Sequence, residues 1–384
     1  MANLNPWQKI TRVLPGRPFG NGADGDYNSS TIPTMTYRSC SGSASSTTLT
    51  LTSAGFSNGD LILIHQTRGT GAGQWEINYI VSGGGTTSLT LLQPLQYTYT
   101  DSGASQAQAV KIPQYTNVTV PSGATWTLPA WNGDTGGILV LAARGTLTVS
   151  GTITGSGKGF VGGDQDIQNY GGNNLSRTGE SNLGDKIHQQ AGYGIAGGAG
   201  YATSSNGADY GGGGGGGYGT AGSNAGSGGG PGGGGGTAGS ADLTSLFFGG
   251  GGGAGASYIV QGQMGGSGGG VVIFFAKSLS ITGAISVNGN NGTVSVQGGT
   301  SNGGGGGAGG SVLIVSSIAT LSSSVITATG GSGVGSPSGG NGGVGRIALH
   351  YSSTYSGSTN PTLYANQDTT LVESVGGSFL FNYL

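Results

Sequence analysis

Very few residues of this chain have types and spacings that support chemistry. The string GSGKGF at 155–160 resembles the end of a phosphate-binding loop, but Gly159 stands where such a loop needs Ser or Thr. Strings of the GxGxxG type recur because glycine is so abundant, and they carry almost no weight as dinucleotide-binding fingerprints. The sequence therefore does not indicate a nucleotide site.

One pair of acids has a spacing used in metal loops. Asp164 and Asp166 stand two residues apart in GGDQDIQNYGG. A calcium loop also needs a further acid and a late bidentate glutamate, and Glu180 is too distant to supply it. We interpret the two aspartates as caps of a local turn. The sequence predicts no metal site and no cofactor.

The three glutamates, Glu76, Glu180 and Glu373, are far apart in the sequence. Enzymes that cleave polysaccharides need two carboxylates that face one glycosidic bond. The spacing indicates no such pair, so we predict that the chain is not an enzyme and has no catalytic residue. A polysaccharide depolymerase of the tailspike kind stays open as an alternative, because the fourteen acidic residues can still converge in the fold.

Histidine and cysteine are also isolated in the sequence. His65, His188 and His350 stand apart, and His65 lies inside an apolar run that is typical of a core strand. We expect His65 to be a hydrogen-bonded core residue. The single cysteine, Cys40, excludes an internal disulfide framework and is interpreted as a small core residue.

Composition narrows the class of protein. Of 384 residues, 90 are Gly and 11 are Pro, while charged residues make up only 7% and the net charge is −2. Glycine does not follow the strict G-X-Y period of collagen. Without a Lys/Arg cluster the chain has neither a nucleic-acid patch nor a polybasic membrane patch. Its apolar runs are too short for membrane insertion, and residues 1–20 have no signal-peptide core.

The elements that must carry this chain are β-strands. We expect an extended arm over 1–36, a β domain over 37–130, a glycine-rich domain over 131–351 and a C-terminal segment over 352–384. Runs such as STTLTLTSAGF and GDLILIHQT have the alternation or the short apolar length of strands. The ending SVGGSFLFNYL is apolar and suggests an intermolecular contact.

An internal repeat begins near Trp131. Its first two copies, 136–157 and 269–289, align at a constant offset that brings Leu147 onto Leu279. A third copy covers 309–330 with a one-residue slip, and 342–351 looks like a truncated fourth. Stacked copies predict a thin β-solenoid. The predicted fold class is all-β: an N-terminal β domain, then a solenoid-like region with an inserted polyglycine-II helix lattice.

The glycine runs are the basis for that lattice. They begin and end at Gly211 and Gly217, Gly232 and Gly236, Gly249 and Gly253, and Gly303 and Gly307. A flexible linker is the alternative, but aromatic residues flank the runs and strands lie beside them. Bare glycine backbones in an extended threefold helix can approach closely and bond in several directions. We therefore predict packed runs.

Strings such as YGGGGGGGYGTAG, PGGGGGTAG and FFGGGGGAGA, within about 191–345, resemble the polyglycine-II adhesin at the tip of T-even-like phage tail fibres. This resemblance implies a rigid sandwich of polyglycine helices whose end loops recognise receptors on the host surface. The sequence around the third repeat copy, such as GGGGGAGGSVLI, also resembles glycine-rich repeats of large bacterial surface proteins.

Residues 161–263 are rich in Tyr, Gly, Ser and Asn. The same residue types are enriched in antibody paratopes. We propose receptor-binding roles for six tyrosines, with the alternative that they only cover the ends of glycine helices: Tyr170, Tyr193, Tyr201, Tyr210, Tyr218 and Tyr258.

The function expected from these observations is a non-catalytic phage tail-fibre or tail-tip protein that binds a host receptor. Its expected partners are a host glycan or outer-surface protein, other virion tail proteins, and identical subunits in a homo-oligomer. Its expected location is the virion tail or the cell surface. The alternatives are a self-assembling bacterial extracellular filament or surface adhesin and, second, the depolymerase.

Overall fold

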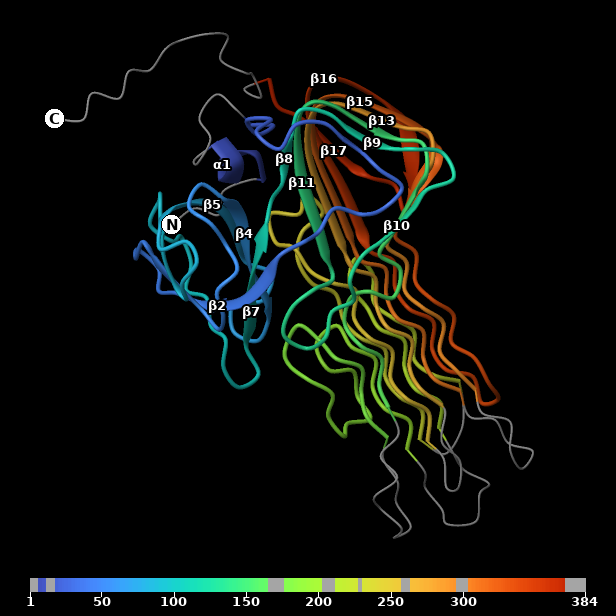
Figure 1. Cartoon of the computed structure of the whole chain (residues 1–384). Helices are drawn as coiled ribbons and strands as arrows, with labels where there is room; N and C mark the ends of the chain where they lie inside the picture. The colour runs from blue at the N-terminus through green and yellow to red at the C-terminus, as the bar shows by residue number, and fades with distance from the viewer. Residues whose placement is uncertain are drawn as a thin grey trace, which may run out of the picture.

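The chain folds into three parts that lie against one another (Figure 1). A small β-barrel packs beside a large parallel sheet, and a bundle of extended glycine segments continues from the sheet. The structure, a computed structural model, describes residues 6–11, 18–164, 176–201, 211–226, 230–256, 263–294 and 303–369. The all-β prediction fits only in part, because a short helix, α1 (Pro6–Thr11), lies within the predicted arm.

The barrel has an apolar interior built from alternating strands. Leu49, Leu51, Leu89 and Leu91 point inward, and the residues between them are exposed. The barrel closes in the order β2-β3-β6-β5-β4-β7, with antiparallel neighbours. Its strands are β2 (Tyr37–Ser41), β3 (Thr48–Leu51), β4 (Leu61–Arg68), β5 (Trp75–Ser82), β6 (Ser88–Leu91) and β7 (Gln106–Lys111).

The second part is an eleven-stranded sheet in which every pairing is parallel. Its main path runs β1-β9-β11-β13-β15-β14-β12-β10, β8 pairs with β11, and β16 and β17 extend it beyond β15. The strands are β1 (Tyr27–Asn28), β8 (Gln114–Tyr115), β9 (Val118–Val120), β10 (Thr125–Thr127), β11 (Ile138–Val149), β12 (Thr152–Thr154), β13 (Val271–Ile281), β14 (Ala284–Ser286), β15 (Ser311–Thr327), β16 (Arg346–Asn360) and β17 (Tyr364–Gln367).

The repeat copies are neighbouring strands of this sheet. Leu147 pairs with Leu279 and Ile153 with Ile285, which confirms the alignment of the first two copies. The solenoid prediction is wrong, because the copies form an open parallel sheet beside a closed barrel. A solenoid winds through short corners, whereas long glycine-rich segments connect β12 to β13 and β14 to β15. After each connection the chain returns to the sheet beside an earlier strand, so that β13 pairs with β11 and β15 with β13.

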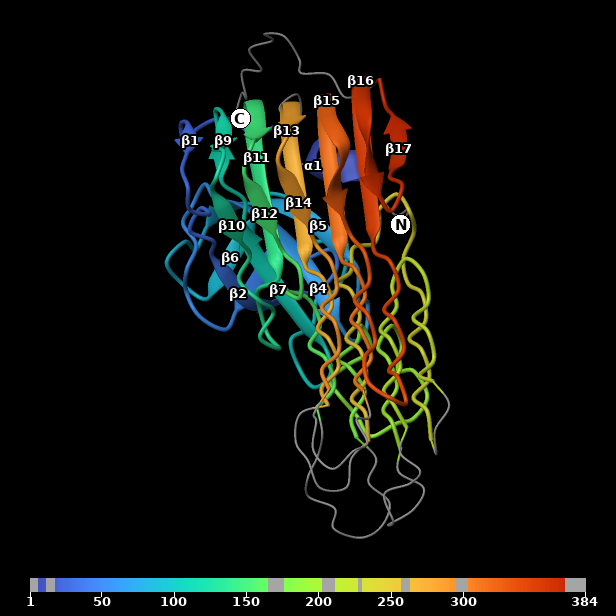
Figure 2. The ribbon, with the colours of Figure 1, turned by 90° about the vertical axis from the view of Figure 1, so that its right-hand side faces the viewer.

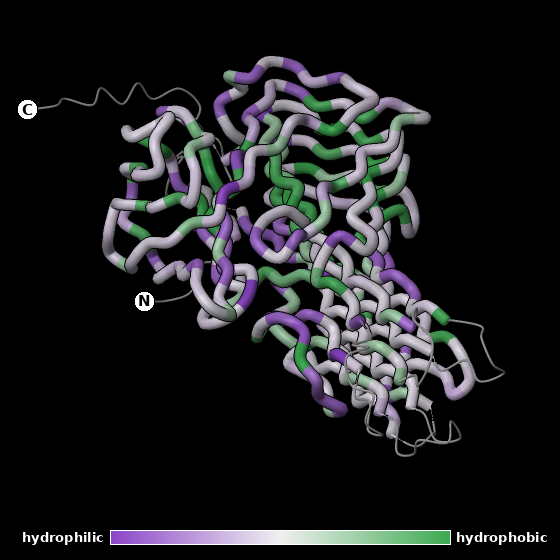
Figure 3. The backbone as a smooth tube through the Cα atoms, turned by 60° about the horizontal axis from the view of Figure 1, so that its bottom comes forward, coloured by the Kyte–Doolittle hydropathy of each residue, from purple (hydrophilic) through white to green (hydrophobic). Residues whose placement is uncertain are grey.

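The sheet bends around its own apolar core. A register shift between Ala143 and Thr146 interrupts the pairing of β11 with β13. Leu141 and Leu147, on either side of it, belong to the same apolar core. A second core joins the sheet to the barrel, where Ile138 and Val271 pack with Leu61 and other barrel residues. Hydrophobic residues are therefore concentrated along the strands, while the glycine segments are nearly neutral in hydropathy (Figure 3).

Helix α1 is fastened to the barrel by a buried lysine. The Lys9 ammonium donates to the carbonyl oxygens of Trp75 (2.8 Å) and Thr244 (3.0 Å), and it lies 4.2 Å from the Trp75 ring centroid. Its side chain is 1% exposed. Burial lowers the pKa of Lys9 to about 7, against the smaller opposing effects of Glu76 and Asp242.

The Lys9→Met variant should change how the unfolding free energy depends on pH, because it removes the buried amino group. Between pH 7 and 10.5 the unfolded chain holds the Lys9 proton more tightly than the folded chain does, so the lysine's contribution to stability rises with pH. The unfolding free energy of the wild type minus that of Lys9→Met should rise by up to about 1.4 kcal/mol per pH unit in this window. Urea titrations at pH 7, 8 and 9 measure it, and a flat difference contradicts the buried-charge account.

Candidate functional site: the glycine bundle and its far end

The glycine segments extend side by side away from the sheet (Figures 1 and 2). Within the run 211–217, the hydrogen-bond partner changes from one residue to the next. The N–H of Gly213 donates to Gly303 (3.0 Å) and that of Gly216 to Gly306 (2.9 Å). Between them, Gly214 donates to Gly198 and Gly215 to Ser223.

The direction of these bonds thus repeats every third residue, as in an extended helix with three residues per turn. None of the glycines in the four runs has a positive φ. All eight glycines that bound the predicted runs donate their N–H to another segment: Gly211, Gly217, Gly232, Gly236, Gly249, Gly253, Gly303 and Gly307.

Close approach explains why these positions are glycine. A Cβ added at Gly214 would lie well inside 3.0 Å of the Gly233 carbonyl oxygen, and one at Gly305 would meet the Gly214 carbonyl oxygen in the same way. Both obstacles are backbone atoms, which cannot turn away as a side chain can. The bundle is therefore held by backbone hydrogen bonds at a separation that excludes side chains.

A buried ion pair joins the bundle to the barrel. Glu180 in the glycine-rich region accepts hydrogen bonds from Arg68 at the end of β4, from Trp131 Nε1 (2.8 Å) and from the Val161 N–H (3.2 Å). Glu180 is 2% exposed. Burial raises the pKa of Glu180, while Trp131, Arg68 and Val161 lower it in part. Sequence spacing offered no sign of this pair, because 112 positions separate its members.

Tyr218 belongs to the core and not to a binding surface. It is 0% exposed, its hydroxyl lies 2.8 Å from Ser311 Oγ, and the Arg346 guanidinium lies 5.5 Å from its ring centroid. Burial raises the pKa of Tyr218 to about 12. Tyr218 is therefore removed from the candidate receptor-binding residues. Its aromatic ring ends the run 211–217 inside the junction with the sheet.

The structure separates the other predicted tyrosines. Tyr193 lies near the barrel, and Asn182 shows this from both sides. The Asn182 backbone carbonyl accepts the N–H of Gly69, which follows β4, and Asn182 Oδ1 accepts the N–H of Ile195, two residues after Tyr193. Tyr201 lies at the far end of the same glycine segment, where its carbonyl accepts the Gly211 N–H. Both side chains are partly exposed. Tyr170, Tyr210 and Tyr258 lie outside the described residues.

The described residues that flank 165–175, 202–210 and 257–262 are bonded to one another. The Arg177 N–H donates to Asp164, the Ser176 N–H to Gly200, and the Ala256 N–H to Gly211. The Tyr201 N–H donates to Gly230, which follows residues 227–229. The described residues on either side of these four segments therefore lie together at one end of the bundle, which we call the far end.

An ionic cluster lies at the far end. Lys186 Nζ is 2.6 Å from Asp164 Oδ2, and Arg177 Nη1 is 3.8 Å from Asp164 Oδ1. Sequence reasoning considered Asp164 only together with Asp166, which is outside the described residues, and missed both cations. Over the residues that the structure describes, no group of three His, Cys, Asp or Glu side chains can hold a metal ion.

The isolated residues of the sequence have structural partners. His65 is 0% exposed, with Nδ1 3.0 Å from Thr67 Oγ1 and Nε2 2.8 Å from the Leu246 carbonyl, which confirms it as a hydrogen-bonded core residue. Burial lowers the pKa of His65 to about 4. Cys40 is also buried, as expected of a small core residue. Glu76 is 1% exposed and accepts the Gln96 N–H.

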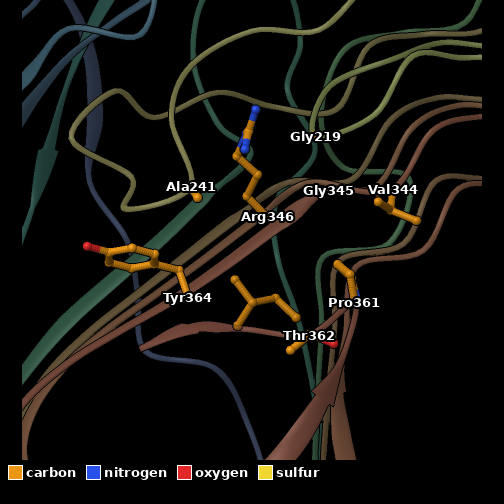
Figure 4. Close-up of a pocket in the computed structure, with 9 residues that line it drawn as sticks. Gly219, Ala241, Val344, Gly345, Arg346, Pro361, Thr362 and Tyr364 are labelled. Carbon is orange, nitrogen blue, oxygen red and sulfur yellow. The ribbon is translucent and has the colours of Figure 1, made fainter. Parts of the chain in front are cut away.

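A small cavity lies where β16 begins (Figure 4). Its walls come from the end of a glycine segment at Gly219, from Arg346 on β16, from Pro361 between β16 and β17, and from Tyr364 at the start of β17. Its volume is about 110 Å³. Pockets that enclose small-molecule substrates measure roughly 300–1,000 Å³, so this cavity is too small to enclose one.

Comparisons with known proteins give no family assignment. Neither the protein-family models nor the curated proteins that were searched match this chain. In the described part of the chain, no helix has the length and apolar character needed to cross a membrane.

Proposed function

We propose that this protein is a non-catalytic, receptor-binding protein of the phage tail-fibre or tail-tip kind. The barrel and sheet would face the virion or partner chains, and the far end of the glycine bundle would contact a glycan or protein of the host surface. The observation that carries the proposal is that the described residues flanking four segments, 165–175, 202–210, 227–229 and 257–262, are hydrogen-bonded to one another at one end of the bundle.

Three features of the bundle support this role. Backbone hydrogen bonds in several directions make it stiff without a side-chain core. The sequence of the connecting segments is rich in Tyr, Ser, Gly and Asn, which give contact area and adaptable hydrogen bonds. Recognition segments on a stiff scaffold lose less conformational entropy on binding than segments on a flexible one.

Binding to host cells tests the proposal. Tyr201→Ala, alone and combined with Tyr210→Ala, should weaken binding to receptive cells at least tenfold without changing the melting temperature. Tyr193→Ala is the matched control, because Tyr193 is also partly exposed but lies at the barrel end of the same segment. Flow cytometry with labelled protein gives the apparent Kd.

Three results would contradict the proposal. If Tyr201→Ala and the double variant bind cells as tightly as the wild type, the far end is not the recognition site. Release of reducing ends from host capsule or lipopolysaccharide would instead support the depolymerase, and long regular fibres of purified protein would support the self-assembling filament.

A further inference from the structure

Asparagine followed by glycine is a chemically reactive pair. The glycine nitrogen can attack the asparagine side-chain amide, because glycine has no Cβ to obstruct the approach. The chain has eight such pairs, and the structure describes both residues of six of them. These six begin at Asn21, Asn58, Asn132, Asn288, Asn291 and Asn341. The attack needs a glycine N–H that is not held in a hydrogen bond, so the fold decides which pair reacts.

In four of the six pairs the glycine N–H is already bonded to a backbone carbonyl, at 2.8–3.0 Å. The bonds run from Gly59 to Ile80, from Gly289 to Thr329, from Gly292 to Ser332 and from Gly342 to Gly331. A nitrogen held in this way cannot turn toward the asparagine side chain until its bond breaks. Three of these pairs lie between β14 and β15 or between β15 and β16, so the packing of the glycine segments also shields them from reaction.

The pair Asn132–Gly133 lies between β10 and β11 and is not shielded. The Gly133 N–H has no hydrogen-bond acceptor among the described residues, and Asn132 is exposed. Asn132 Oδ1 accepts the N–H groups of Asp134 (3.0 Å) and Thr135 (2.9 Å). Negative charge develops on this oxygen when the glycine nitrogen attacks Cγ. The two N–H groups are placed to stabilise that charge, as donors do in an oxyanion hole.

The pair Asn21–Gly22 is the nearest competitor. Its glycine N–H is also unbonded within the described part of the chain. However, Asn21 Oδ1 accepts only one N–H, that of Ala23 (2.9 Å), and the Asn21 N–H is held by Gln114 Oε1 (3.2 Å). Asn21 is also only partly exposed. We expect Asn21 to react after Asn132.

We propose that Asn132 is a site of spontaneous covalent modification, at which the Gly133 nitrogen closes a succinimide ring on the Asn132 side chain. The bond from the Gly133 nitrogen to Asn132 Cγ forms, and the bond from Cγ to Nδ2 breaks. The proton of the glycine N–H leaves with Nδ2, which departs as ammonia. Water then opens one of the two carbon–nitrogen bonds of the imide. Opening at Cγ gives aspartate, and opening at the main-chain carbonyl of residue 132 gives isoaspartate.

The modification changes the turn that leads from the barrel to the sheet. This turn is closed by the Asn132 N–H, which donates to the Thr135 carbonyl (3.1 Å), and it follows Trp131, which donates to the buried Glu180. Isoaspartate adds one carbon to the main chain within this turn. Either product also adds a carboxylate two residues from Asp134. This chemistry is independent of receptor binding.

Peptide mapping of the full-length protein tests the site. The wild type is incubated at pH 8 in heavy-oxygen water and then digested in ordinary water, so that heavy oxygen marks only the asparagines converted during incubation. Conversion of Asn132 should be at least tenfold faster than that of the four shielded asparagines, which serve as internal controls. Asn21 should fall between them. Mass spectrometry of the peptides gives each rate.

The same incubation in urea is the matched control. Unfolding removes the hydrogen bonds that distinguish the six pairs, so their rates should then agree within about threefold. A second control is the Asn132→Ser variant, which cannot form the imide. After incubation the wild type should show a second, lower-melting population that grows with the isoaspartate content, and Asn132→Ser should not. Asn58→Ser should behave as the wild type does.

Three outcomes would overturn the proposal. One is a native rate at Asn132 no greater than the rates of the shielded pairs. Another is the same ranking of rates in urea, because local sequence and not the fold would then be the cause. The third is faster conversion of Asn21 than of Asn132, which would remove the role of the two N–H groups on Asn132 Oδ1.

Discussion

Gly214→Ala should destabilise the protein by about 3 kcal/mol, an effect at the upper end of overpacked substitutions. The added methyl group would overlap the Gly233 carbonyl oxygen, a backbone atom that itself belongs to a bonded segment. Relief requires two segments to separate, and that breaks hydrogen bonds on several sides. Loss of unfolded-state entropy on replacing Gly by Ala stabilises by only about 0.4–1 kcal/mol and does not offset the clash.

Gly236→Ala is the control within the same bundle. Only the Gly194 carbonyl oxygen lies near a Cβ at that position, at 3.2 Å, and Gly236 is exposed. We expect a change within about 0.5 kcal/mol, as for surface substitutions elsewhere. Urea unfolding followed by circular dichroism measures both variants. Equal stability of Gly214→Ala and Gly236→Ala would mean that the segments are not packed as described.

Arg68→Ala should cost about 3–5 kcal/mol at pH 7, because it leaves the buried carboxylate of Glu180 without its cation. Trp131 and Val161 can still donate to Glu180, but neither donor carries a charge. Arg144→Ala removes an exposed arginine and should change stability by less than about 0.5 kcal/mol. Urea unfolding at pH 7 compares the two, and a cost below about 1 kcal/mol for Arg68→Ala would contradict the role of the pair.

The pH dependence of Glu180→Gln provides an independent check on this pair. Because burial raises the pKa of Glu180 above 4.5, the folded chain holds this proton more tightly than the unfolded chain. The contribution of Glu180 to stability is therefore greatest in acid and falls as the pH rises through the folded pKa. The unfolding free energy of the wild type minus that of Glu180→Gln should decrease from pH 4 to pH 7. An increase over this range would show that Arg68 outweighs the effect of burial.

The expected strands and the pairing of the first repeat copies could be predicted from local pattern. Leu147 and Leu279 align because both copies alternate apolar and small polar residues with the same period, and parallel strands keep that register. His65 was predictable as a core residue because the apolar run around it is buried from end to end.

The solenoid prediction was wrong because the hydrophobic pattern within each repeat copy does not specify the path of the chain between copies. The glycine-rich connections have no hydrophobic period, so nothing in them indicates whether they turn at once or make a long excursion. In the structure they make long excursions, and the copies become neighbours in an open sheet. The prediction for Tyr218 was wrong for a related reason. The sequence around Tyr218 resembles that of a recognition loop, but its ring is buried in the core where the bundle meets the sheet.

The sequence by itself determined which stretches become strands, which residues of each strand face inward, and where glycine is concentrated, because these depend on side-chain type and short periods. Tertiary structure alone decided which carbonyl each glycine N–H meets and that Arg68 and Glu180 share a buried site. Glycine has no side chain to encode a partner. The partner of each glycine is therefore settled only when all the segments pack together.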